Sequence, residues 1–328
     1  MNNTKINKIA GFLLKLCIII LAFGFITYEL IYKKDISNIY SYFFNIINTK
    51  NITILIIVCL LMFVNWGFEL LKWRFLIGRI ERISIFQSII AVFSGITVST
   101  ITPNRIGEYG GRVFVLEPSN RWKGVVLTIV GSISQLITTL CIGIASVLVI
   151  YPLFNLPDVM DFAIVFLAVL LFFIFLTFYF NVSVILNIIE RIKFLKKIIK
   201  YLTVLSELQK RELVIVLFYS ILRHLVFSFQ FYLLFLLCGI DLHFYQSFVI
   251  TSVIFLVLTA IPTIALAEFG VRGSVTLVVF GLFFKANSNI EFINIAVVTS
   301  AFLLWLVNIA IPAIIGSFFI FRLKIFKH

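Results

Sequence analysis

Glu108-Tyr109-Gly110-Gly111-Arg112 and Glu268-Phe269-Gly270-Val271-Arg272 are two copies of one short motif, in which Glu, an aromatic residue and Gly are followed two residues later by Arg. The copies lie 160 residues apart, about half of the 328-residue chain. Each copy follows a proline, Pro103 or Pro262, that interrupts an apolar run. Charges and helix breakers at matched places in two hydrophobic halves indicate a transporter-type site between repeats.

The composition indicates a membrane protein. Hydrophobic residues make up 62% of the chain and charged residues only 12%, and the mean hydropathy is +1.15. A soluble protein of this length needs a polar surface that this composition cannot supply. We expect one membrane domain over residues 1–328, with no soluble catalytic domain at either end. Basic cytoplasmic loops explain the net charge of +13 better than nucleic-acid binding does.

The sequence predicts neither a metal nor another cofactor. The chain has only three histidines, and its cysteines show no CxxC spacing. All four cysteines lie inside apolar runs, at Cys17, Cys59, Cys141 and Cys238.

Six apolar runs are long enough to cross a bilayer, which takes roughly 20 helical residues. No small-residue cleavage site follows the first run, so we interpret it as a retained span rather than a signal peptide. The six predicted spans are Ala10–Tyr32, Ile52–Leu71, Gly124–Tyr151, Phe162–Phe180, Leu213–Leu237 and Phe292–Phe321.

Two further segments, Phe86–Leu116 and Ser247–Phe284, are predicted to be re-entrant helical hairpins. Each begins with a short apolar piece that contains Ser and Thr, is broken at its proline, and ends with a second apolar piece. If both hairpins return to the side from which they enter, most Lys and Arg residues lie on the side of the N-terminus. The other side then holds only Lys33, Lys34, Lys50 and Lys285. By the positive-inside rule, both termini are cytoplasmic and the protein lies in the cytoplasmic membrane.

The expected fold is an all-α polytopic membrane protein with six full spans and two re-entrant hairpins in an inverted repeat. Residues 1–151 form the first half and residues 162–321 the second, and the hairpin tips meet near the bilayer midplane. Within the second half, residues 182–212 place Ile and Leu at helical spacing among lysines. This pattern predicts a basic amphipathic helix on the anionic inner leaflet. A simple solvated linker helix is the alternative.

Five charged residues near the breaks are candidate binding groups. Non-helical backbone at membrane depth persists only beside protein or water, so we expect the breaks to line a cavity. Helix N-termini and arginine forks both suit a phosphate, which Arg105, Arg112 and Arg272 would bind. Glu108 and Glu268 would neutralise these arginines in the empty site. Alternatively, each Glu and the Arg four residues later form an intrahelical ion pair that only braces its hairpin.

The breaks themselves are assigned to prolines and glycines, because Pro removes a helical hydrogen bond and Gly permits tight turns. These residues are Pro103, Gly107, Gly110, Pro262 and Gly270.

Polar residues inside the predicted spans are further candidates. Arg223 is a candidate binding group, because a charged residue within a membrane helix is a functional candidate by default. His224 is either a proton-coupling group or a partner in a helix-to-helix hydrogen bond. Gln230 and Asn308 are predicted to bond between helices. Lys72-Trp73-Arg74 is typical of an anchor at the membrane interface.

The first motif region resembles that of the lysylphosphatidylglycerol synthase transmembrane-region family, also called flippase-like membrane proteins. The resemblance rests on Thr102-Pro103-Asn104-Arg105-Ile106-Gly107-Glu108 with Arg112, and on Gly270-Val271-Arg272 after a broken helix. It covers nearly the whole chain in span order. Two features depart from the family pattern: Asn104 replaces a Gly, and Glu268 precedes the second Arg instead of following it.

The resemblance implies a lipid translocator. In the bifunctional members, the membrane unit is associated with moving a phospholipid between leaflets, and a separate soluble domain performs aminoacyl transfer. We therefore expect a transporter rather than an enzyme, acting on a phospholipid or a lipid-linked glycan carrier. Two alternatives stay open: a membrane-embedded transferase, for which Asp158 and Asp161 are the only close aspartates, and a non-catalytic partner in envelope polysaccharide or glycolipid assembly.

Overall fold

The computed structural model describes residues 49–150, 158–181, 199–261, 265–283 and 290–323, together with Leu13 and Ile20. Every regular element within these ranges is a helix. The all-α prediction is therefore confirmed for the described part of the chain. The predicted span Ala10–Tyr32 and most of the 182–212 linker lie outside it, as does Pro262.

Four long apolar helices match four of the predicted spans, and by length and composition each can cross a membrane. The fourth is continuous through α13, a π-helical turn (η5) and α14. A further apolar helix, α7 (Asp158–Phe180), matches the predicted span at Phe162–Phe180. The long helices are α3 (Thr49–Ile77), α6 (Arg121–Ile150), α10 (Lys210–Leu237) and the run of α13 (Ile290–Trp305), η5 (Leu306–Ala310) and α14 (Ile311–Ile320).

The first predicted hairpin folds back on itself. Its elements are α4 (Ile85–Thr100), the 3-10 turn η1 (Pro103–Arg105) and α5 (Gly107–Val113). A Cβ on Gly111 would lie 2.7 Å from the Gly95 Cα, so the backbones of α4 and α5 touch at paired glycines. The second segment forms α11 (Phe244–Ala260) and α12 (Ala265–Phe283), which also pack on each other.

The break in the first hairpin is shorter than the sequence suggested. Asn104 and Arg105 have φ of 48° and 58°, so the non-helical backbone centres on them. Gly107 begins α5, and its N–H donates to the Thr102 hydroxyl at 2.8 Å. Gly110, however, lies inside α5, which corrects its assignment as a break.

Gly270 likewise lies inside α12, so it does not break the second hairpin. The helix instead resumes at Ala265 and places Glu268 in its first turn, as α5 does with Glu108. A carboxylate at a helix N-terminus interacts favourably with the helix dipole, which is the physical reason that both helices begin ahead of their motifs.

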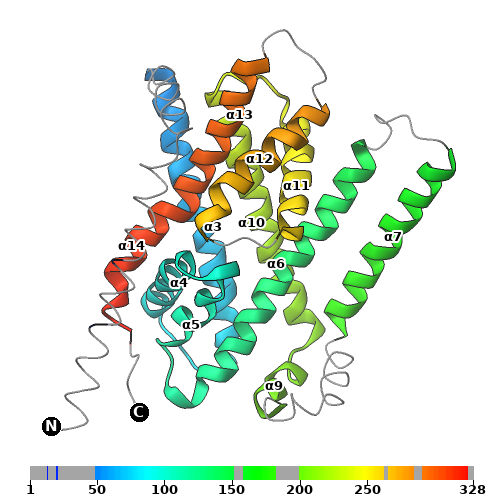
Figure 1. The fold of residues 1–328 in the computed structure, drawn as a ribbon. Helices are drawn as coiled ribbons and strands as arrows, with labels where there is room; N and C mark the ends of the chain where they lie inside the picture. Colours follow the sequence, from blue (N-terminus) through cyan, green and yellow to red (C-terminus); the bar gives the residue numbers. More distant parts are fainter. Residues whose placement is uncertain are drawn as a thin grey trace.

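The helices of the two halves contact each other in a reciprocal pattern, which can be followed in Figure 1. Helices α3 and α10 pack together at the centre, α14 packs on α4, and α6 packs on α11. Glycines allow both outer contacts. A Cβ on Gly316 of α14 would lie 2.0 Å from the Phe93 carbonyl oxygen, and one on Gly143 of α6 would lie 2.6 Å from the Leu256 Cβ.

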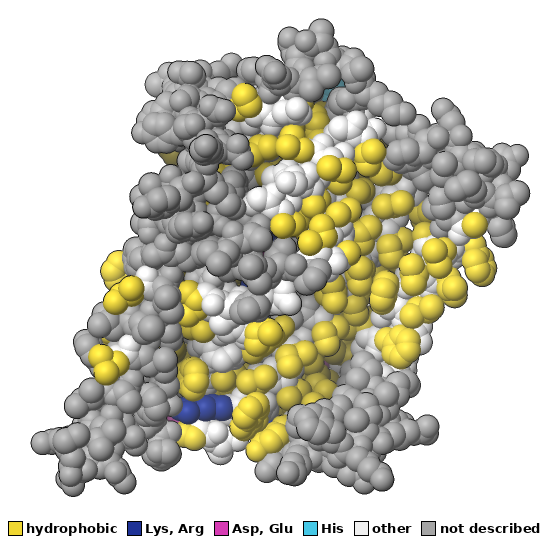
Figure 2. All heavy atoms as spheres, viewed as in Figure 1, with side chains coloured by type: hydrophobic (Ala, Val, Ile, Leu, Met, Phe, Trp, Pro, Cys, Tyr) yellow, Lys and Arg dark blue, Asp and Glu magenta, His cyan; other side chains and the backbone are white. Residues whose placement is uncertain are grey.

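Apolar side chains gather over α6 and α7 on the face seen in Figure 2, and α7 lies to the right of α6 in Figure 1. Ile133 of α6 and Phe173 of α7 are exposed, and exposed apolar side chains of this kind suit contact with lipid tails. The described part of the predicted linker includes α9 (Ile199–Ser206), which packs against α6. Its place at the inner leaflet stays a prediction.

Candidate functional site

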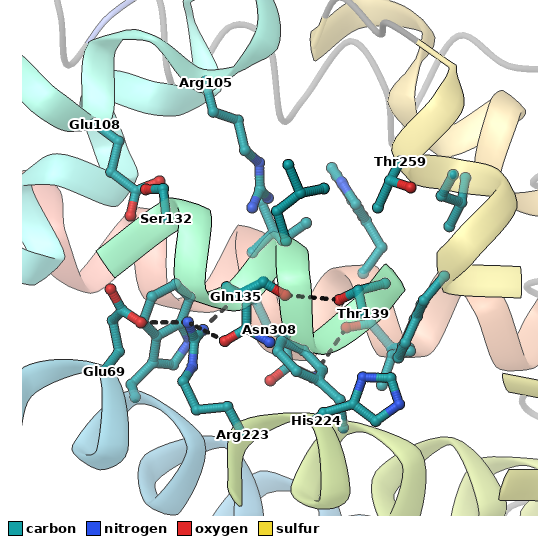
Figure 3. A pocket seen from close by; sticks show the side chains of 18 of the residues that line it. Glu69, Arg105, Glu108, Ser132, Gln135, Thr139, Arg223, His224, Thr259 and Asn308 are labelled. Carbon is teal, nitrogen blue, oxygen red and sulfur yellow. Dashed lines mark hydrogen bonds and ion pairs between the residues drawn. The ribbon is translucent and has the colours of Figure 1, made fainter. Parts of the chain in front are cut away.

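A cavity of about 480 Å³ lies between the two hairpins and the central helices. Figure 3 shows charged and polar side chains converging on it, Glu69 from α3, Arg105 and Glu108 from the first hairpin, and Arg223 from α10. Aromatic side chains, among them Phe227 and Phe255, also line the cavity. A cavity lined by both charged and apolar side chains suits an amphiphilic ligand.

Glu69 is the centre of the charged wall. Its side chain is only 6% exposed and forms ion pairs with three cations. The Lys72 Nζ lies 2.8 Å from one carboxylate oxygen, the Arg112 Nη1 lies 2.7 Å from the other, and Arg223 is also paired with Glu69. A buried carboxylate and buried cations are each costly alone, so this cluster is stable only as a unit.

Arg112 lies behind the cavity wall rather than in it. It pairs with Glu69 and with Glu108 of its own motif, and its side chain is 3% exposed. Glycine at position 95 is required beside it, because a Cβ there would lie 2.7 Å from the Arg112 Cγ. The predicted Glu108–Arg112 ion pair is therefore present, but it belongs to a network that reaches α3.

Arg223 is oriented by three side chains of α3. Its Nε donates to the Asn65 Oδ1 at 3.0 Å, and its guanidinium lies 5.1 Å from the centre of the Trp66 ring. Asn65 in turn donates to the Asn308 Oδ1 at 3.1 Å. The amide, the aromatic face and Glu69 fix the guanidinium at the cavity wall, where it is buried.

The π-helical turn η5 contributes a backbone carbonyl to this arrangement. The Trp66 Nε1 donates to the Asn308 carbonyl at 3.2 Å. Pro312 has no N–H to donate to that carbonyl four residues earlier, so the carbonyl is available to Trp66. π-helical turns are frequent at functional sites, and this one lies against the cavity through Asn308 and Ile309.

The second motif is held more loosely than the first. Arg272 Nε and Nη2 lie 3.1 and 2.8 Å from one oxygen of Glu268, so the predicted pair is present. The same oxygen lies 3.5 Å from Arg105 Nη2, which links the two hairpins. The side chains of Arg105 and Arg272 are 37% and 23% exposed, and both line the cavity.

His224 lies on the aromatic side of the cavity. Its Nε2 is 3.1 Å from the Ser252 hydroxyl of α11, which confirms the predicted contact between helices. Its ring meets Phe248 and Phe255 edge-on, with centroids 5.9 and 5.7 Å away. A role in proton coupling stays a prediction.

The polar pairs predicted to join helices are also present. Gln230 Nε2 donates to the Val58 carbonyl at 2.9 Å, which ties α10 to α3, and Asn308 contacts Asn65 as described above.

Sequence reasoning missed Glu69 and misplaced Lys72. The predicted interface anchor at Lys72-Trp73-Arg74 is wrong for its first two residues, because α3 continues to Ile77 and buries both side chains. Lys72 pairs with Glu69, and the Trp73 Nε1 donates to the Thr128 hydroxyl at 2.9 Å. The available signal was the i,i+3 spacing of Glu69 and Lys72 at the end of an apolar run.

Among the described residues, no group of three or more His, Cys, Asp or Glu side chains is placed to hold a metal ion. The aspartates of the transferase alternative, Asp158 and Asp161, lie in the first turn of α7.

Apolar helices long enough to span a bilayer, together with a buried ionic cluster around a cavity, define a polytopic helical membrane protein with a polar interior site. Residues 12–311 match the family described as the lysylphosphatidylglycerol synthase TM region. The chain belongs to this family, which confirms the resemblance and associates the protein with membrane lipids. No curated protein and no solved structure matches the chain.

Proposed function

We propose that this protein translocates an anionic phospholipid or a lipid-linked glycan carrier across the cytoplasmic membrane. One observation carries the proposal: Arg105 and Arg272, which belong to different hairpins, share the single carboxylate of Glu268 at the edge of a cavity. Two arginines that share one carboxylate keep further N–H donors that can bind a phosphate. Arginine forks bind phosphate oxygens in pairs, so both side chains can grip one headgroup.

Binding of the phosphate would exchange one anion for another. The Arg105–Glu268 distance of 3.5 Å is long for a hydrogen bond, so this contact is the easiest of the network to open. A phosphate between the two arginines would replace Glu268 as their partner, and departure of the lipid would restore the pair. In the empty site Glu268 thus offsets part of the charge of the two arginines, which lowers the cost of burying that charge in a membrane.

Helix α6 suits the passage of a lipid headgroup while the acyl chains of the same lipid stay in the bilayer. Ser132, Gln135 and Thr139 line the cavity on one face of this helix. Ile129 and Ile133 of the same helix are exposed and lie outside the cavity lining. A polar stripe beside an apolar surface allows the headgroup to move along protein while the acyl chains remain in the bilayer.

The reciprocal packing supports an inverted repeat of residues 1–151 and 162–321, and the positive-inside rule supports cytoplasmic termini. In this arrangement each hairpin rests on the last long helix of the other half, α4 on α14 and α11 on α6. Rocking of the hairpins on these close, glycine-lined contacts would open the cavity to alternate leaflets. No ATP motif is present in the sequence, so the driving force would be a gradient, a coupled ion or the lipid imbalance itself.

The test is leaflet exchange in liposomes. Purified protein is reconstituted with fluorescent anionic and zwitterionic lipids, the outer leaflet is quenched, and the remaining signal is followed. We expect fast exchange of anionic lipid with the wild type and loss of exchange with Arg105→Gln/Arg272→Gln. Arg79→Gln is the matched control, because Arg79 forms a partly exposed ion pair with Glu212 outside the cavity lining.

Exchange that is equal in the double variant and the wild type would contradict the proposed site. No exchange of any lipid by correctly oriented protein would contradict translocation. The transferase alternative would then be tested by the dependence of transferase activity on a metal ion. The alternative of a partner in envelope assembly would be tested by co-purification.

A further inference from the structure

The charged groups around the cavity do not balance. The ion-pair network of the described residues holds five basic side chains but three acidic ones. The bases are Lys72, Arg105, Arg112, Arg223 and Arg272, and the acids are Glu69, Glu108 and Glu268. The empty site therefore has an excess of two positive charges when these groups are ionised.

The excess is divided between two sets of ion pairs, one around Glu69 and Glu108 and the other around Glu268. On the first side, Glu69 and Glu108 face Lys72, Arg112 and Arg223, which leaves one positive charge over. On the second side, the carboxylate of Glu268 faces both Arg105 and Arg272, which again leaves one over. Lys72, Arg105, Arg223 and Arg272 all line the same cavity, so both excess charges act on one ligand.

We propose that the headgroup bound in this cavity carries two negative charges, as in a phosphomonoester or a pyrophosphate-linked lipid, rather than the single charge of a phosphodiester. This inference rests on the proposed function and narrows its substrate class. A phosphomonoester carries about two negative charges at pH 7, and it presents three strong acceptor oxygens. Such a group neutralises the excess on both sides of the cavity, whereas a phosphodiester leaves one cation without a counter-ion in a partly buried site.

Phosphatidic acid and phosphatidylglycerol make a matched pair of probes. They share the diacylglycerol body and differ in whether the phosphate is a monoester or a diester. Binding is measured by competition in lipid nanodiscs of a zwitterionic phospholipid, independently of transport. We expect phosphatidic acid to bind at least about tenfold more tightly, because one additional charge pair at hydrogen-bond distance exceeds the interaction energy of a tenfold change.

Variants test whether the charge balance sets this preference. Arg272→Gln removes one positive charge and is expected to bring the two affinities together. Glu108→Gln removes one negative charge and is expected to widen the preference. Arg79→Gln, outside the cavity lining, is expected to leave the preference unchanged. Thermal unfolding of each variant identifies any that fail to fold, and Arg272→Lys, which keeps the charge, is expected to retain the preference.

Each outcome decides a different point. Equal affinity for the two lipids, or tighter binding of the diester, overturns the dianionic headgroup. A preference for the monoester without leaflet exchange supports the charge inference and contradicts translocation. Binding of neither lipid contradicts both. Inorganic phosphate is added as a competitor in the same experiment: displacement at concentrations comparable to those of phosphatidic acid would identify free phosphate, not a lipid, as the ligand and overturn the lipid assignment.

Discussion

The two hairpins contain the same motif, but they hold its arginine in different ways. Arg112 is buried between two carboxylates, one of them from α3, whereas Arg272 is partly exposed and, among the described residues, pairs with one carboxylate that it shares with Arg105. The central helices explain the difference. Helix α3 places Glu69 in the network, and α10, which packs against it, places Arg223 there. The same motif thus forms a buried network of ion pairs in one half and a partly exposed one in the other.

Removal of the Glu69 carboxylate is expected to have the largest effect on stability, so it is the strongest test of the difference between the hairpins. Glu69→Gln leaves Lys72, Arg112 and Arg223 with too few counter-ions in a buried region. We expect a loss of about 3–5 kcal/mol in the free energy of unfolding, as for other broken buried ion pairs. Thermal and denaturant unfolding in lipid nanodiscs measures it. Glu268→Gln, whose partners are partly exposed, is the matched control, and an equal loss there would contradict the difference between the hairpins.

The glycine contacts allow a second comparison, between the two hairpin supports. Gly316→Ala places a Cβ 2.0 Å from a backbone carbonyl of α4, while Gly143→Ala places one 2.6 Å from the Leu256 Cβ of α11. We expect Gly316→Ala to cost about 1–3 kcal/mol, as overpacking does, and Gly143→Ala to cost less, because its closest contact is longer. Gly281→Ala, which meets nothing within 4 Å, is the control in the same unfolding assay. The reverse order would contradict the tighter first contact.

The turn of the first hairpin is expected to contribute less to the free energy of unfolding than the glycine contacts do. Asn104 has φ of 48°, a left-handed conformation that Asn adopts more readily than Ala. Asn104→Ala should cost about 1 kcal/mol in unfolding free energy, and Asn104→Gly should be close to neutral because Gly has no Cβ penalty. If Ala and Gly behave alike, the left-handed backbone does not limit stability.

The smallest effect on stability is expected at Arg272, where the effect on transport is largest. Arg112→Gln removes a buried partner of Glu69 and should lower the unfolding temperature more than Arg272→Gln does. In leaflet exchange the order should reverse, because Arg272 lines the cavity and Arg112 does not. Folded Arg112→Gln protein with no exchange, beside active Arg272→Gln, would reverse the assigned roles.

The sequence predicts the fold class and several site residues because hydrophobic length and repeated motifs are local signals. The two motif pairs follow from spacing that can be read along the chain, whereas the contact between Arg105 and Glu268 joins residues that are distant in sequence. Glu69 could not be assigned in this way, because its partners Arg112 and Arg223 are distant in sequence and meet it only after α3 packs on α10. Gly110 and Gly270 show the opposite error: local breaker propensity was overruled by helix packing and by carboxylates at the helix starts.

The π-helical turn at 306–310 also determines which residues the end of the chain presents to its neighbours. Such a turn contains one residue more than a turn of α-helix, so every later residue is rotated by about 100° relative to a regular helix. Gly316 and Pro312 both follow it. Loss of a single residue from this turn would rotate Gly316 away from Phe93 and bring a bulkier side chain against α4. The register of α14 on the first hairpin therefore depends on the one additional residue of the π-helical turn. Deletion or insertion of a residue in this turn would be less tolerated than substitution.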